Sequence, residues 1–142
     1  SVLVAWYLAE MGWPINIVRA GLMHDGSEAY IGDIIRPLKV LLPDYKTIEN
    51  TWMAAIFERF GLLSEGWENA NVKEADRNAY ECEVFYQIPD VTLYGFLSRE
   101  RLCDIVTAHQ KISPSQRFAR QAWCPERAEM EFLKLAKFIN IS

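Results

Sequence analysis

Apolar residues recur at spacings of three and four along most of this chain, and this feature limits its fold more than any other. Such spacing predicts amphipathic helices that each bury one face. A sustained alternation of apolar and polar residues, the pattern of a half-buried strand, is missing from the sequence, as are internal repeats and heptads. The sequence therefore predicts an all-α fold, built as a compact helical bundle.

Helix boundaries follow from this pattern together with proline and glycine. Apolar residues surround the first helix on nearly every side, so we expect it in the middle of the bundle. The helix that follows Pro43, with Asp44 as its N-cap, has a predicted apolar face made of Tyr45, Ile48, Trp52, Ala55, Ile56 and Phe60. The predicted helical segments are 1–11, 14–24, short pieces within 28–39, 43–60, about 67–85, about 99–109 and 125 onward, with a loop at 113–115.

The chain has 142 residues, the size of one ordinary domain, and we expect a single domain over 1–142. It opens inside an apolar helical pattern, so we also expect a native segment before Ser1. The net charge of −4 argues against strong nucleic-acid binding, which needs a basic surface. The sequence has no apolar run of the length that spans a membrane. Its three widely spaced cysteines suggest no disulfide framework, which favours a cytoplasmic location.

Ionisable side chains are concentrated in the stretch HDGSEAYIGD, directly after an apolar segment. His24, Asp25, Glu28 and Asp33 fall within these ten residues. The P-loop, GxGxxG, HExxH and GxSxG motifs are absent from the sequence. His24 offers a nitrogen ligand beside the oxygen ligand of Asp25, and both reach one cation only if it lies between helices. The pattern predicts a divalent metal site completed by residues from elsewhere in the chain.

Asp76 is the best distant ligand. It lies beside the apolar stripe of the predicted helix 67–85, where a buried carboxylate without a cation would be unstable. That stripe consists of Val72, Ala75, Ala79, Cys82 and Tyr86. Taken singly, Asp76 is equally well explained as an ion-pair partner of Lys73 or Arg77. Glu28 and Asp33 are, on the same terms, equally well explained as solvated acids.

Together these stretches resemble a known family. The block HDGSEAYIGDIIRPLK, the later KEADRNAYECE and the opening SVLVAWYLAE are similar to the HD superfamily of phosphohydrolases, especially the compact bacterial and phage branch. That branch includes 5′-deoxynucleotidases and deoxynucleoside triphosphate hydrolases. The resemblance covers nearly the whole chain and implies a compact HD-domain helical bundle. It also implies a divalent ion (Co, Mn, Zn, Mg or Fe) held by His24, Asp25 and Asp76, with a further His just before Ser1.

The resemblance also implies roles for residues around the metal. Glu28 and Asp33 would position or activate the attacking water and assist the leaving group. The residues implied in substrate binding, of which Lys39 would hold phosphate oxygens, are Arg36, Pro37, Lys39 and Lys73. This chemistry is coherent, because a divalent ion polarises a phosphoryl oxygen and lowers the pKa of bound water, while a lysine offsets phosphate charge.

The expected function is that of a metal-dependent phosphohydrolase of deoxynucleotides, either a triphosphohydrolase of dNTPs, with dATP preferred, or a 5′-nucleotidase of dNMPs. One alternative is a phosphodiesterase for cyclic or oligonucleotides, which usually needs more His ligands than His24 and His109 provide. The other alternative is a regulatory HD module that binds a nucleotide without turnover. A nucleotide is the expected partner, no membrane association is expected, and a homo-oligomer is compatible with every one of these functions.

Overall fold

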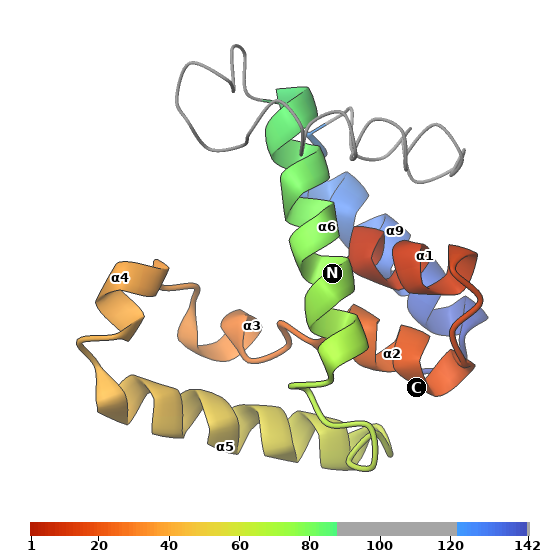
Figure 1. Ribbon diagram of the computed structural model, residues 1–142. Helices are drawn as coiled ribbons and strands as arrows, with labels where there is room; N and C mark the ends of the chain where they lie inside the picture. The colour runs from red at the N-terminus through yellow and green to blue at the C-terminus, as the bar shows by residue number, and fades with distance from the viewer. Residues whose placement is uncertain (88–121, 142) are drawn as a thin grey trace.

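The computed structural model describes residues 1–87 and 122–141, and within these ranges the chain is helical and contains no strand. The predicted helix 99–109 and loop 113–115 lie outside the described residues. The described helices confirm the all-α prediction, including the short pieces within 28–39 (Figure 1). They are α1(Val2–Glu10), α2(Ile15–Met23), α3(Glu28–Ile31), α4(Arg36–Lys39), α5(Pro43–Arg59), α6(Ala70–Gln87) and α9(Pro125–Phe138).

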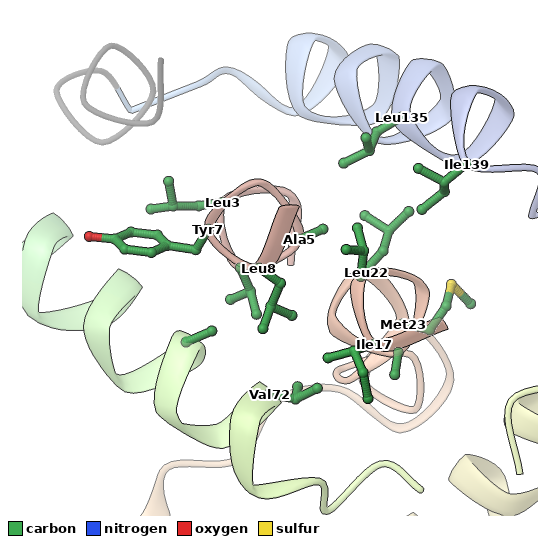
Figure 2. Close-up of a cluster of buried hydrophobic side chains, with 14 of the residues drawn as sticks. Leu3, Ala5, Tyr7, Leu8, Ile17, Leu22, Met23, Val72, Leu135 and Ile139 are labelled. Carbon is green, nitrogen blue, oxygen red and sulfur yellow. The ribbon is translucent and has the colours of Figure 1, made fainter. Parts of the chain in front are cut away.

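Helix α1 is the centre of the bundle, as its apolar sequence predicts. It packs against α2, α6 and α9, and Leu3, Val4, Ala5, Tyr7 and Leu8 are buried. Figure 2 shows side chains of α1 and α2 gathered toward α6 on one side and α9 on the other. The apolar area removed from water by these contacts is the main stabilising contribution to the fold.

The apolar stripe of α6 completes this core. Val72, Ala75, Ala79 and Cys82 recur at helical spacing and are all buried, as predicted. On α9, Leu135 and Ile139 are buried, whereas Phe138 is 83% exposed. The small alanines of α6 allow its backbone to approach α1 closely, which fixes the position of the neighbouring polar residues of α6.

Helix α5 differs from its prediction. Ile56 is buried, as predicted, together with Met53 and Phe57, whereas Ile48 is 49% and Trp52 is 38% exposed. The reason is tertiary: α5 contacts the bundle through α2, and its N-terminal part extends beside α4 to one side of the molecule (Figure 1). Trp52 stacks on Tyr30 instead, with ring centroids 4.3 Å apart.

The start of α5 also differs in detail from the prediction. Leu42 is the N-cap and makes no side-chain cap bond, Pro43 occupies the first helical turn, and Asp44 follows within that turn. The predicted stop is confirmed, because Gly61 adopts a φ of +67°, a conformation that glycine tolerates best. None of the described helices is both long enough and apolar enough to cross a bilayer.

Candidate functional site

The candidate site begins at His24, the residue that ends α2. Its Nδ1 lies 2.8 Å from the carbonyl oxygen of Gly21. A carbonyl only accepts hydrogen bonds, so Nδ1 carries the proton and donates to Gly21. In the neutral ring, Nε2 therefore presents its lone pair, which is the form of histidine that binds a metal ion.

His24 Nε2 faces two carboxylates from different parts of the chain. Asp25 Oδ2 is 2.9 Å away and Asp76 Oδ1, on α6, is 3.3 Å away. Neither oxygen is aligned for a hydrogen bond, so Nε2 is a buried nitrogen without a well-formed partner. A buried polar atom in this state is unfavourable unless a proton or a cation lies between it and the oxygens.

The electrostatics of this cluster depend on those short contacts. Burial alone would lower the pKa of His24, but the Asp25 and Asp76 carboxylates outweigh it and raise the pKa to about 9. For Asp25 the effects are opposite: burial alone would raise its pKa, but the facing His24 ring holds the pKa below its ordinary value. A positive charge at Nε2 is thus stabilised by both carboxylates.

The spacing within the cluster matches that of neighbouring ligands on one ion. Two ligands bound at about 2.1 Å with an angle near 90° to 110° are separated by about 3.0 to 3.4 Å. Among the described residues, however, no group of three or more His, Cys, Asp or Glu side chains has the arrangement of a finished metal site. Asp76 is the ligand that can adjust, because its side chain is 54% exposed.

That exposure corrects one part of the sequence argument. Asp76 was expected to be a buried carboxylate, but the buried stripe of α6 is occupied by Val72, Ala75 and Ala79, and Asp76 stands at its edge. Ser1 also reaches the cluster, because its Oγ lies 3.5 Å from Asp25 Oδ2. The N-cap of α1 therefore lies beside the residues that directly follow α2.

A cavity of about 180 Å³ opens from this cluster, and we call it the inner cavity. Its lining combines His24, Asp25, Glu28 and Asp76 with lysines from three helices. Those lysines are Lys39, Lys46 and Lys73. They also line a wider groove of about 800 Å³, the outer groove, together with Asp33, Ile34, Ile35, Val40, Tyr45 and Tyr80.

The two acids predicted for proton transfer occupy different places. Glu28 lines the inner cavity, where burial and then the negative charges of Asp25 and Asp33 raise its pKa to about 7. Asp33 lines only the outer groove, is 68% exposed, and has its Oδ1 3.7 Å from Lys39 Nζ. The geometry therefore gives Glu28 a pKa suited to exchanging protons near neutral pH, while Asp33 is a solvated partner of a lysine.

The predicted substrate-binding residues also separate. Lys39 and Lys73 line both the inner cavity and the outer groove. Pro37 is exposed and lines neither of them, and the side chain of Arg36 lies outside the described part of the structure.

Sequence reasoning missed Lys46 and Glu49 of α5. These two residues form an i,i+3 ion pair with Lys46 Nζ 3.2 Å from Glu49 Oε2. The spacing was visible in the predicted helix 43–60, but such pairs are common on solvated helix faces and do not by themselves indicate a site.

Comparisons with known proteins relate only part of the chain to another protein. A stretch of 49 residues, 34% of the chain, is 58% identical to a protein of Escherichia coli K12 described as the uncharacterized protein YfdR. The match spans 28% of the length of YfdR. No family model matches the chain. No solved structure matches it either.

Proposed function

We propose that this chain is a metal-dependent phosphohydrolase of the HD type that acts on deoxynucleotides. The observation that carries the proposal is His24 Nε2, a buried nitrogen that faces Asp25 Oδ2 and Asp76 Oδ1 at 2.9 and 3.3 Å. One nitrogen and two carboxylate oxygens suit a divalent ion such as Mn, Co, Zn, Mg or Fe. The resemblance of the HDGSEAYIGDIIRPLK block to HD phosphohydrolases supports the same function.

The hydrogen bonding of the His24 ring also favours binding of a divalent ion. The bond from Nδ1 to Gly21 O fixes the ring tautomer and aims Nε2 at the cluster, as metal-binding histidines usually require. When bound, the ion supplies Lewis acidity toward a phosphoryl oxygen and acidifies a water molecule. Asp25, which follows α2, and Asp76 of α6 would hold it together with His24.

The chain's own residues then bind the phosphate and move a proton. Lys39 and Lys73 line the inner cavity and offset the charge on phosphate oxygens. Glu28, with its pKa raised to about 7 by burial and by Asp25 and Asp33, accepts a proton from the attacking water and returns it to the leaving group. The inner cavity positions these groups around one phosphoryl group.

Substituting Asp76 with Asn tests the proposal directly. This change keeps the shape of the side chain and removes the charge, whereas Asp44→Asn removes the charge of an exposed aspartate in the first turn of α5. We expect the Asp76→Asn protein to bind Mn²⁺ at least about tenfold more weakly, measured by titration calorimetry. Its hydrolysis of deoxynucleotides should fall by about 10² or more, with Asp44→Asn near the parental values.

The substrate panel separates this function from its alternatives. It includes deoxynucleoside mono- and triphosphates, a cyclic nucleotide and a short oligonucleotide, each with every candidate ion. Turnover restricted to the cyclic and oligonucleotide substrates would identify a phosphodiesterase. Tight nucleotide binding with no turnover would identify a regulatory module. Equal metal affinity in the Asp76→Asn and parental proteins would refute the metal site.

A further inference from the structure

Three lysines and two glutamates form a continuous line of alternating charges along the site. Lys39 Nζ lies 3.0 Å from Glu49 Oε1, and Lys46 Nζ lies 3.2 Å from Glu49 Oε2. The second glutamate, Glu68, repeats this arrangement, because its two carboxylate oxygens lie 3.5 Å from Lys46 Nζ and 3.5 Å from Lys73 Nζ. The lysines come from α4, α5 and α6, so the line joins elements distant in sequence.

The more buried of the two glutamates, Glu49, is itself a bound anion. Glu49 is only 13% exposed, and its carboxylate accepts hydrogen bonds from two ammonium groups on different helices. Burial raises the pKa of Glu49, but the adjacent Lys39 and Lys46 outweigh it and hold the pKa below its ordinary value. The two ammonium groups therefore already converge on one anionic group, as they would on a phosphate.

The sizes of the two hollows determine how far a ligand extends. The inner cavity of about 180 Å³ is smaller than the roughly 300 Å³ at the low end of sites for whole small molecules. A ligand that reaches the His24 cluster must therefore continue into the outer groove of about 800 Å³. Lys39, Lys46 and Lys73 line both hollows, so they flank the part of the ligand that joins the two.

We propose that Lys46, together with Lys39 and Lys73, binds the phosphate chain of a substrate that carries at least two consecutive phosphates. Glu49 is a positioning residue that holds Lys39 and Lys46 beside each other. This inference rests on the proposed function and specifies its substrate as a nucleoside di- or triphosphate. A single phosphate inside the inner cavity would contact only part of the lysine line, whereas a phosphate chain extends along it from the inner cavity to the outer groove.

The chain offers a closely matched control for Lys46. Lys134 on α9 pairs with Glu131 at the same i,i+3 spacing and the same N–O distance of 3.2 Å, and its side chain is 61% exposed against 53% for Lys46. The variants Lys46→Met and Lys134→Met each keep the aliphatic stem and remove one charge. They differ in that Lys134 lies away from both hollows of the site.

The first experiment compares the triphosphate and monophosphate of deoxyadenosine as substrates, with Mn²⁺ present. We expect Lys46→Met to lower kcat/KM for the triphosphate about tenfold or more, the usual loss for a charge-assisted contact, and for the monophosphate less than about twofold. Lys134→Met should leave both values unchanged. Equal effects of Lys46→Met on the two substrates, or no effect, would overturn the inference.

The second experiment measures binding of inorganic tripolyphosphate and of orthophosphate to the protein. A chelator removes divalent ions, so that binding is measured without hydrolysis. We expect Lys46→Met to weaken tripolyphosphate binding selectively. Glu49→Gln should tighten it, because the competing carboxylate is lost, while lowering kcat because the lysines are less well placed. A purely structural Glu49 would not tighten anion binding.

The two experiments distinguish failure of this inference from failure of the proposed function. If the parent hydrolyses neither nucleotide but binds tripolyphosphate through Lys46, the proposed function is wrong and the inference that Lys46 binds a phosphate chain stands. If the parent hydrolyses both nucleotides and Lys46→Met changes neither the rates of hydrolysis nor tripolyphosphate binding, the inference about Lys46 is wrong and the proposed function stands.

Discussion

Replacing Glu28 with Gln should stabilise the metal-free protein above neutral pH. Burial and the charges of Asp25 and Asp33 raise the pKa of Glu28 to about 7 from an ordinary value of 4.5. Because its folded pKa lies above its unfolded pKa, the folded state binds more protons between pH 4.5 and pH 7. The free energy of unfolding therefore falls as the pH rises through that window, and the full penalty is present above pH 7.

The structure sets the size of this effect. A pKa difference from 4.5 to about 7 corresponds to at most about 3 kcal/mol, at about 1.36 kcal/mol for each pH unit. Glu28 is only partly buried, and water screens part of that interaction, so we expect a gain of about 1 to 2 kcal/mol for Glu28→Gln at pH 8. Below pH 4.5 the parental side chain is protonated in both states, and the gain should vanish.

Urea denaturation in the presence of a chelator, at pH 4 and pH 8, measures the difference. The control is Glu74→Gln, which removes the same charge from an exposed glutamate of α6. If Glu28→Gln and Glu74→Gln change the free energy of unfolding equally at pH 8, Glu28 is not held at an unfavourable position and the electrostatic argument is wrong. Added Mn²⁺ should reduce the advantage of Glu28→Gln, because a nearby cation favours the ionised carboxylate.

Three further predictions concern activity and metal binding. In a steady-state assay, Asp33→Ala should lower nucleotide hydrolysis less than about tenfold, because Asp33 is 68% exposed in the outer groove. Glu28→Ala should lower hydrolysis by about 10² or more in the same assay. Lys39→Met should change the free energy of unfolding in urea by under about 1 kcal/mol, because Glu49 keeps its contact with Lys46, yet lower kcat/KM about 10- to 150-fold. Ser1 Oγ lies 3.5 Å from Asp25 Oδ2, so a residue added before Ser1 would lie near the His24 cluster. A chain with one added His should therefore bind Mn²⁺ at least about tenfold more tightly, measured by calorimetry, than a chain with one added Ala. Equal affinities would exclude a ligand at that position.

The helices were predictable where the sequence decides them locally. Apolar residues at helical spacing mark α1 and α6, and Pro43 and Gly61 mark the two ends of α5. The buried face of α5 was not predictable in the same way. Its N-terminal part, which includes Ile48, contacts α4, and Trp52 stacks on Tyr30, so both are exposed despite an apolar pattern that predicts burial. Which half of a helix meets the core depends on the tertiary arrangement of its partners.

The site was predictable in composition but not in geometry. The adjacent residues His24 and Asp25 are visible in the sequence, and the period of α6 brings Asp76 to the edge of the core, although the burial argument for Asp76 was wrong. The role of Lys46 was hidden, because it depends on its contact with Glu68 in the segment before α6 and on the contact of Glu49 with Lys39 of α4. Contacts between elements distant in sequence leave no local signal in a single chain.

The charges around the inner cavity suggest how a bound metal ion would affect phosphate affinity. With His24 protonated, as its pKa of about 9 implies near neutral pH, the cavity lining carries four positive groups, His24 and the three lysines, against the four carboxylates of Asp25, Glu49, Glu68 and Asp76. Ionisation of Glu28, whose pKa is about 7, makes the lining negative, and negative charge disfavours a phosphate anion in a partly enclosed space. A divalent cation that takes the place of the His24 proton adds one net positive charge. On the proposed function, the phosphate binding that the lysines provide without the ion should therefore tighten once the ion is bound.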